Sequence, residues 1–242
     1  MLTGLLFRRK SLIYVTLLVL LVLPLTACQV PSDNEGASTD ITPIETIHNE
    51  QGDLVFNISC EELIQRWNVV CHNDDLECLL PDASEMESTV LDRAIHSEHI
   101  TKCYVYLPGD EHFFPILSIY TSEESEEILQ INLSYNEHDY RENTWELHKD
   151  MCLASLRVLM PDQSKSDIEA FCQIVYQEAA DNMFPYEQDY GHGAVPSILF
   201  HHNGIGVYPY FAAGSRNHFC VIPVDDDLLE QMEATGTEVK EC

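Results

Sequence analysis

The stretch Ile198–Phe211, ILFHHNGIGVYPYF, carries the strongest kind of short-range signal for a β-hairpin. Its Asn203-Gly204 dipeptide separates two apolar and aromatic runs, and this pattern predicts a β-hairpin closed by a type I′ turn. A further apolar run, His218–Val224, predicts a third strand after a loop that contains Gly214. The C-terminal part of the chain is therefore expected to form an antiparallel group of strands.

An earlier part of the chain predicts a similar group of three strands. The runs Lys102–Pro108, Phe113–Thr121 and Glu126–Tyr135 are rich in β-branched and aromatic residues. In the last run apolar and polar residues alternate, which is typical of a half-buried strand. Short polar loops join the three runs, so we expect antiparallel connections.

Helices are predicted before the first group of strands and between the two groups. In Asn57–Cys71, Ser59 followed by Glu62 forms a capping box, and the apolar residues after it recur at helical spacing. The segment 145–160 is helix-forming, the turn 161–167 interrupts it, and Ser166 with Glu169 forms a second capping box. A short loop between two helices predicts an antiparallel helical hairpin.

These elements predict an α+β fold. The expected order is α-β-β-β-α-α-β-β-β, with an N-terminal helix, a central helical hairpin and antiparallel sheet or sheets. Strands gathered in groups, with helices between the groups, favour this class over a parallel α/β sheet.

The N-terminus carries an export signal. Arg8, Arg9 and Lys10 precede a twelve-residue run, Leu12–Leu23, which is apolar except for Thr16. A membrane-spanning helix needs about 20 apolar residues, so the run has the length of a signal-peptide core rather than of an anchor. An uncleaved short anchor is the alternative. The sequence therefore directs the chain out of the cytoplasm.

The residues that follow, Leu25-Thr26-Ala27-Cys28, resemble the lipobox of bacterial lipoproteins. The resemblance covers only the first 28 residues, and we identify no family for the rest of the chain. It implies cleavage before Cys28 and attachment of diacylglycerol, with acyl chains such as palmitate, to the Cys28 thiol. An ordinary secretory signal with a chance cysteine is the competing interpretation. Several acyl chains give the stable anchoring that a single chain does not.

Three regions follow from this interpretation. Residues 1–27 are the signal peptide, residues 28–52 form a lipidated, disordered acidic tether, and residues 53–242 form one globular domain. The tether is rich in Ser, Thr, Asp, Glu, Gly and Pro, and it lacks an apolar period. Such a segment does not bury enough apolar surface to offset the entropy of ordering it.

Eight cysteines follow Cys28, and an even number in an exported chain predicts disulfides and few free thiols. Cys60 and Cys71 are about 16 Å apart on the predicted helix, which is too far for a bond that needs Cα atoms within about 7 Å. Cys71 and Cys78 flank a polar loop, and a local bridge between them is expected. Cys152 and Cys172 lie at similar depth in the helical hairpin, and we expect a bridge there too.

Charge limits the partners of the protein. Without residues 1–27 the chain keeps 9 basic and 41 acidic residues, a formal charge of −32. This charge argues against nucleic acid, which is bound through Lys and Arg, and against a body that lies flat on an anionic bilayer. A solvated acidic surface is the simplest explanation. A basic partner or divalent cations are the more specific ones.

The best site candidate lies between Tyr186 and Phe211, where glycine-containing loops carry acidic and histidine side chains. A transition metal can bind if these side chains converge: Glu187, Asp189, His192, His201 and His202. Neighbouring strand residues point to opposite faces, so only one of His201 and His202 can face a given site. We favour the simpler interpretation, a polar hairpin edge, and predict neither a bound metal nor another cofactor.

No familiar catalytic motif occurs in the sequence, and no catalytic residue is predicted. Cys220 near His201, His202 and His218 is a nucleophile only if its thiol is not oxidised. The acids of Val224–Asp227 are expected to precede a helix, because negative charge suits a helix N-terminus.

The sequence therefore favours a non-enzymatic binding module, lipid-anchored on the extracytoplasmic face of the cell membrane. Its partner would be an envelope protein, a peptide or a wall component, and exposed aromatics such as Tyr208 and Tyr210 would serve the contact. The alternatives are a lipoprotein that binds a small molecule or metal, and an envelope hydrolase whose active site has no linear motif.

Overall fold

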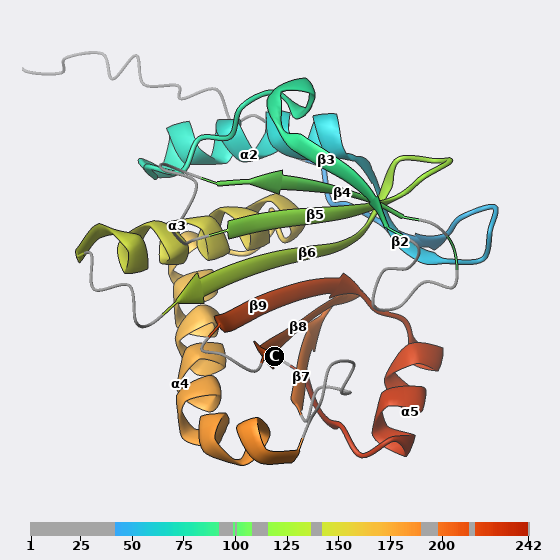
Figure 1. Cartoon of the computed structure of the whole chain (residues 1–242), viewed down its shortest axis with the longest axis vertical. Helices are drawn as coiled ribbons and strands as arrows, with labels where there is room; N and C mark the ends of the chain where they lie inside the picture. Colours follow the sequence, from blue (N-terminus) through green and yellow to red (C-terminus); the bar gives the residue numbers. More distant parts are fainter. Residues whose placement is uncertain are drawn as a thin grey trace, which may run out of the picture. The chain divides into compact units, whose positions relative to one another are not determined.

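The computed structural model describes residues 42–91, 99, 101–107, 116–136, 142–189, 198–212 and 216–241. Within this part of the chain the fold is mixed α+β, as predicted, and Figure 1 shows helices lining a long twisted sheet. The segment Ile41–Cys242 forms one compact unit. The lipobox and most of the proposed tether lie outside the described residues.

In the described part of the chain, one sheet contains ten strands. They are β1 (Thr46–His48), β2 (Leu54–Ser59), β3 (Glu87–Leu91), β4 (Thr101–Tyr106), β5 (Ile116–Ser122), β6 (Glu127–Asn136), β7 (Ile198–His202), β8 (Ile205–Ala212), β9 (Arg216–Pro223) and β10 (Glu238–Glu241). Their order is β10-β7-β8-β9-β6-β5-β4-β3, with β2 pairing β1 and β6. The β10–β7 pair is parallel and the other pairs are antiparallel, so the sheet is mixed rather than purely antiparallel.

The predicted β7–β8 hairpin is confirmed. Asn203 and Gly204 have φ values of 46° and 82°, and the positive sign at both positions is the signature of a type I′ turn. His202 pairs with Ile205 across the two-residue loop. The hairpin is also tied to β1, because the Thr46 hydroxyl donates a hydrogen bond to the Gly204 carbonyl at 2.9 Å.

Four α-helices and one 3₁₀ turn accompany the sheet in the described part of the chain: α2 (Cys60–Asp74), η2 (Ala83–Glu85), α3 (Glu142–Leu159), α4 (Lys165–Asp189) and α5 (Asp226–Ala234). Helix α2 begins as predicted, with the Ser59 hydroxyl accepting the Glu62 amide at 3.2 Å. The second half of the predicted capping box is not formed, because the Glu62 carboxylate contacts Arg66, at 2.6 Å, instead of returning to the Ser59 N–H. Helix α5 also begins as predicted, because the Asp225 carboxylate caps it by accepting the Leu228 amide.

The helices cover both faces of the sheet. The main core contains residues of α2, α3 and α4 together with alternate strand residues such as Phe200, Val207 and Phe219. The residues between these, among them Leu199 and Tyr208, pack against Met232 of α5. Because successive strand side chains point to opposite faces, α5 lies on the face away from α2, α3 and α4 (Figure 1).

The predicted element order is incomplete. Among the described residues, β1 and β2 precede α2, β3 precedes the first predicted strand group, and α5 and β10 follow the last one. β1 lies inside the segment predicted to be a disordered tether, where it pairs with β2 and Ile44 is buried. The ordered body therefore begins before residue 53.

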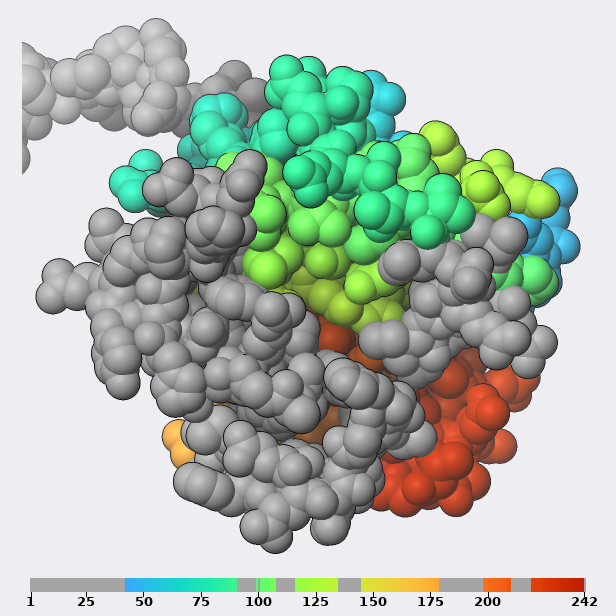
Figure 2. Space-filling model, in the orientation of Figure 1, coloured from blue at the N-terminus to red at the C-terminus, as the bar shows by residue number. Residues whose placement is uncertain are grey.

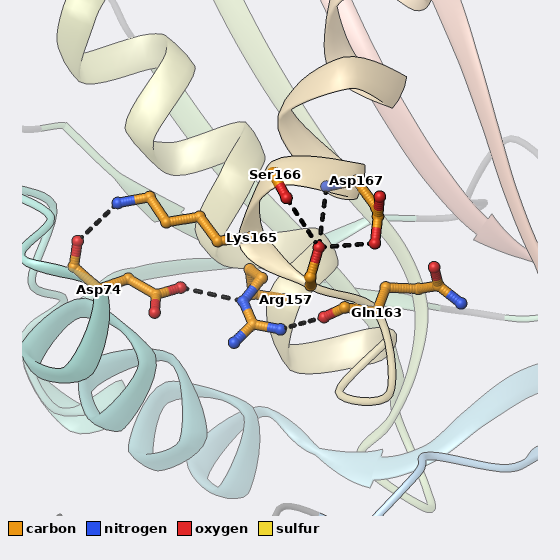
Figure 3. A network of polar contacts seen from close by, with 7 residues as sticks. Asp74, Arg157, Gln163, Lys165, Ser166 and Asp167 are labelled. Carbon is orange, nitrogen blue, oxygen red and sulfur yellow. Dashed lines mark hydrogen bonds and ion pairs between the residues drawn. The ribbon is translucent and has the colours of Figure 1, made fainter.

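The cap of α4 also differs from the prediction. The helix begins at Lys165, and the hydroxyl of Ser164, not of Ser166, accepts the Asp167 amide at 3.2 Å. Figure 3 shows this cap beside a polar network that joins three helices. In the network Arg157 donates to the Asp74 carboxylate and to the Gln163 carbonyl, and the Lys165 ammonium donates to the Asp74 carbonyl. The turn between α3 and α4 is thereby fixed against the end of α2.

The predicted disulfide staple is not found in the described residues, whose seven cysteines are all free and buried. Cys152 and Cys172 both lie in the main core between α3 and α4, where they pack as small apolar side chains. The Cys71 and Cys78 sulfurs are 3.4 Å apart, well beyond the length of an S–S bond. Core packing, not a covalent link, therefore joins the elements in this structure.

Candidate functional site

A fork in the sheet creates a pocket that polar and apolar side chains line together. Strand β6 is ten residues long, and one of its edges pairs first with β2, at Glu127 and Ile128, and then with β9, from Ile131 onward. Leu129 lies between these two pairings and forms a β-bulge. On the other edge of β6, Ile128 pairs with Thr121 of β5 and Gln130 pairs with Tyr120, so Leu129 has no partner in β5. Leu129 and Gln130 are thus left between the diverging strands, and they form one wall of the pocket.

The other walls come from the β1–β2 turn, the end of β9 and the first turns of α5. Figure 2 shows the β1–β2 turn (blue) and α5 (red) at the right-hand edge of the molecule. The pocket has a volume of about 410 Å³. Its polar lining is His48, Gln51, Asp53, His99, Gln130, Asp225, Asp227 and Gln231, and its apolar lining is Leu54, Leu129, Ile222, Pro223 and Leu228.

Two histidine–aspartate pairs flank the pocket. The His48 Nε2 atom lies 3.0 Å from the Asp225 carboxylate, and the His99 Nδ1 atom lies 3.1 Å from the Asp53 carboxylate. The first pair is open to water, with side-chain exposures of 60% and 31%, whereas the Asp53 side chain is only 8% exposed. The pocket therefore presents carboxylates at both an exposed rim and a buried wall.

His48 faces hydrogen-bond acceptors with both of its ring nitrogens. Its Nδ1 lies 3.1 Å from the Gly52 carbonyl, and its Nε2 lies against Asp225. A neutral imidazole has only one N–H, so only the imidazolium satisfies both acceptors. The Gly52 carbonyl and the Asp225 carboxylate accordingly raise the pKa of His48 above its ordinary value of 6.5.

This geometry predicts a pH-dependent contribution of His48 to stability. Because the folded-state pKa is raised, the contribution is fully present below pH 6.5, the ordinary pKa that applies to the unfolded chain, and it is lost as pH rises through the folded-state value. Replacing His48 with glutamine should therefore lower the melting temperature more at pH 5.5 than at pH 8.5. The effect should be small, since the pair is exposed to water and salt.

Thermal unfolding of both chains across this pH range measures the difference directly, because all other titrating groups are common to them. An NMR titration of the His48 ring should give a pKa above 6.5. A His48→Gln effect that grows with rising pH would contradict the assignment.

The chemistry of the pocket suits a ligand that is cationic at one end and apolar along its length. The Asp225 and Asp53 carboxylates already face histidine rings, and among the described residues Asp227 is the lining carboxylate without an ion-pair partner. Leu228, Ile222 and Pro223 line the pocket with apolar surface. Lysine and arginine side chains lay their methylene stems along apolar surface and keep the charged head among polar groups. The pocket has the size and lining for such a side chain.

The residues predicted as a weak metal site are not brought together by what the structure describes. Glu187 and Asp189 lie in the last turn of α4, with side chains outside the described residues, and His192 lies outside them altogether. His201 lies in β7 opposite Gly206, and His202 lies opposite Ile205. No three metal-binding side chains converge within the described part of the chain.

His202 lies instead in a largely apolar hollow beside α4. Its Nε2 contacts the Gln163 amide nitrogen at 3.2 Å and the Asn203 amide nitrogen at 3.0 Å. The hollow has a volume of about 470 Å³, and Phe171 and Ile174 of α4 line it. His202 thus packs against the α3–α4 turn.

Two other predicted features are changed by the structure. Tyr208, expected as an exposed aromatic, is only 1% exposed and packs under α5, while the Tyr210 side chain is outside the described residues. Burial raises the pKa of the Cys220 thiol, and it raises the pKa of Cys60 and of Cys172 to about 12. These thiols are therefore protonated at neutral pH and are poor nucleophiles.

No known protein family, curated protein or solved structure matches this chain. None of the helices in the described ranges is long and apolar enough to cross a bilayer.

Proposed function

We propose that the protein is a lipoprotein, anchored through Cys28 to the extracytoplasmic face of the cell membrane, whose body binds a cationic partner. The partner is an envelope protein or peptide that inserts a lysine or arginine side chain into the pocket at the sheet fork. The observation that carries this proposal is the pocket itself, with carboxylates around an apolar lining. The formal charge of −32 after residue 27 supports it, because such a field attracts cations over distance.

Hexalysine is a defined probe for this binding. We expect it to bind the full chain at low ionic strength and to dissociate as salt is added, because the Debye length falls to about 10 Å at 0.1 M salt. The same peptide with acetylated side chains has no ammonium groups on its lysines and should bind much more weakly. Equal binding of the two peptides would contradict a cationic ligand.

A matched pair of variants tests whether the pocket is the site. Asp226 and Asp227 are neighbours in the first turn of α5, both exposed, but only Asp227 lines the pocket. Replacing either with asparagine changes the overall charge equally. Asp227→Asn should weaken hexalysine binding by up to about fivefold, the range expected for one exposed ion pair, and Asp226→Asn should weaken it less.

Isothermal titration calorimetry at one ionic strength compares the two variants with the unchanged chain. If both variants weaken binding equally, the peptide responds to the general acidic surface, and the pocket is not its site.

A further inference from the structure

Cys71 and Cys78 form the one close pair of thiols in the described part of the chain. Their sulfurs are 3.4 Å apart, and both residues are buried, with exposures of 1% and 4%. An S–S bond is about 2.05 Å long, so a small movement would join the two sulfurs. No other two described cysteines are in sulfur–sulfur contact.

The segment 76–80 holds Cys78 against α2 through side chains of that helix. After α2 ends, Asp75 adopts a left-handed conformation and the chain turns back along the helix. The Trp67 indole N–H then donates to the Cys78 carbonyl at 2.8 Å. The Asn68 side-chain amide donates a hydrogen bond to the Leu80 carbonyl at 2.9 Å and accepts one from the Leu80 backbone N–H at 2.8 Å. The two thiols are thus placed together before any bond forms between them.

The proton balance of the pair makes Cys71 the more reactive sulfur. The hydrogen bond from the Cys78 thiol lowers the pKa of Cys71, and the same contact together with burial raises the pKa of Cys78. Of the two, Cys71 therefore loses its proton first. A thiolate is the form that attacks a disulfide.

We propose that Cys71 and Cys78 are a disulfide-forming site, oxidised by thiol–disulfide exchange when residues 76–80 swing away from α2. The Cys71 thiolate attacks one sulfur of an oxidising disulfide and releases the other as a thiolate. Cys78 then loses its proton and attacks Cys71 in the mixed disulfide, which closes the Cys71–Cys78 bond and releases the second thiolate. The two protein thiols lose two electrons and two protons, and the oxidising disulfide becomes two thiols.

Opening of the segment is required because neither sulfur is accessible in the closed structure. It breaks the hydrogen bonds from Trp67 and Asn68 but leaves α2 itself intact. Once the segment closes again, the new bond is buried and is shielded from reducing thiols. More free thiols are then expected than the sequence predicts, because the other five described cysteines, Cys60, Cys103, Cys152, Cys172 and Cys220, remain reduced.

Oxidised glutathione is the probe, used on the purified, fully reduced chain under native conditions. After the remaining thiols are alkylated, the chain is digested without reduction by a protease that cuts after glutamate. Glu77 lies between the two cysteines, so their peptides stay together only if a disulfide links them. We expect a linked Cys71–Cys78 pair that is lighter by two hydrogens. Linkage of Cys71 to another cysteine, or both cysteines alkylated, would overturn the proposal.

The opening step is tested with Asn68→Ala and the control Gln65→Ala, an exposed position on the same helix. Asn68→Ala should speed the oxidation roughly tenfold, because it removes two hydrogen bonds of ordinary strength from the closed segment. Gln65→Ala should leave the rate unchanged. Equal rates in the two variants would show that the segment is not the gate. The assay does not depend on the lipid anchor or on the pocket, so its result is independent of the proposed function.

Discussion

Replacing Cys28 with alanine is expected to move nearly all of the protein out of the membrane fraction, or to leave it unprocessed with residues 1–27 attached. The sulfur of Cys28 would carry the diacylglycerol, and alanine has no atom that can accept it. The acidic body has no attraction to an anionic bilayer, so we expect no second means of anchoring. Cell fractionation with detection of the body, combined with sequencing of its N-terminus, measures both outcomes.

Val30→Ala is a matched control for this change, because it alters a nearby residue and leaves Leu25-Thr26-Ala27-Cys28 intact. It should be processed and retained like the unchanged protein. A Cys28→Ala chain that stays in the membrane fraction with a correctly cleaved N-terminus would disprove lipid anchoring at this residue.

Replacing Trp67 with alanine is expected to lower the free energy of unfolding by about 4 kcal/mol, which is typical for a buried tryptophan. Trp67 is fully buried at the centre of the α2 face. Its loss opens a cavity in the main core and leaves the Cys78 carbonyl without the indole donor. Urea unfolding followed by circular dichroism gives the difference between the two chains.

Two further variants separate the causes. Trp67→Phe keeps most of the apolar volume but removes the indole N–H, so it should lower the free energy of unfolding less than Trp67→Ala does. Gln65→Ala, at an exposed position of the same helix, should change stability by less than about 0.5 kcal/mol. If Trp67→Ala lowers the free energy of unfolding no more than Gln65→Ala does, then Trp67 does not pack α2 against the main core.

Elements marked by a local signal could be predicted from the sequence. The Ser59 cap of α2, the Asn203-Gly204 turn and the Asp225 cap of α5 each depend on residues within three positions of one another. Their geometry is decided by the backbone at that point, so distant residues hardly affect it. The three central strands were predicted for the same reason, because each carries its own β-branched and aromatic pattern.

Elements that depend on distant partners were missed. β10, Glu238–Glu241, has a mostly charged sequence and is a strand only because β7 provides a parallel neighbour. β1 lies in a polar segment and is held by β2 and by the Thr46 hydrogen bond to Gly204. At the start of α4, Ser164 and Ser166 are both suitable cap residues by type. Ser164 is the cap in the structure, where its neighbours Gln163 and Lys165 are held by hydrogen bonds to Arg157 and Asp74.

The candidate site could not be predicted from the sequence, because its residues come from distant segments. His48 and Asp225 are 177 positions apart, and His99 and Asp53 are 46 apart. Only the fork of β2 and β9 along one edge of β6 brings them together. His48 also lay in the segment expected to be a disordered tether, so its position in the sequence gave no indication of a site.

The most direct test of a lipid-anchored binding module is the mass of the N-terminal peptide of protein extracted from membranes with detergent. We predict that this peptide begins at Cys28 and carries diacylglycerol on the Cys28 sulfur, with residues 1–27 absent. A membrane-extracted chain that begins at Cys28 without added lipid, or that keeps residues 1–27, would contradict the account.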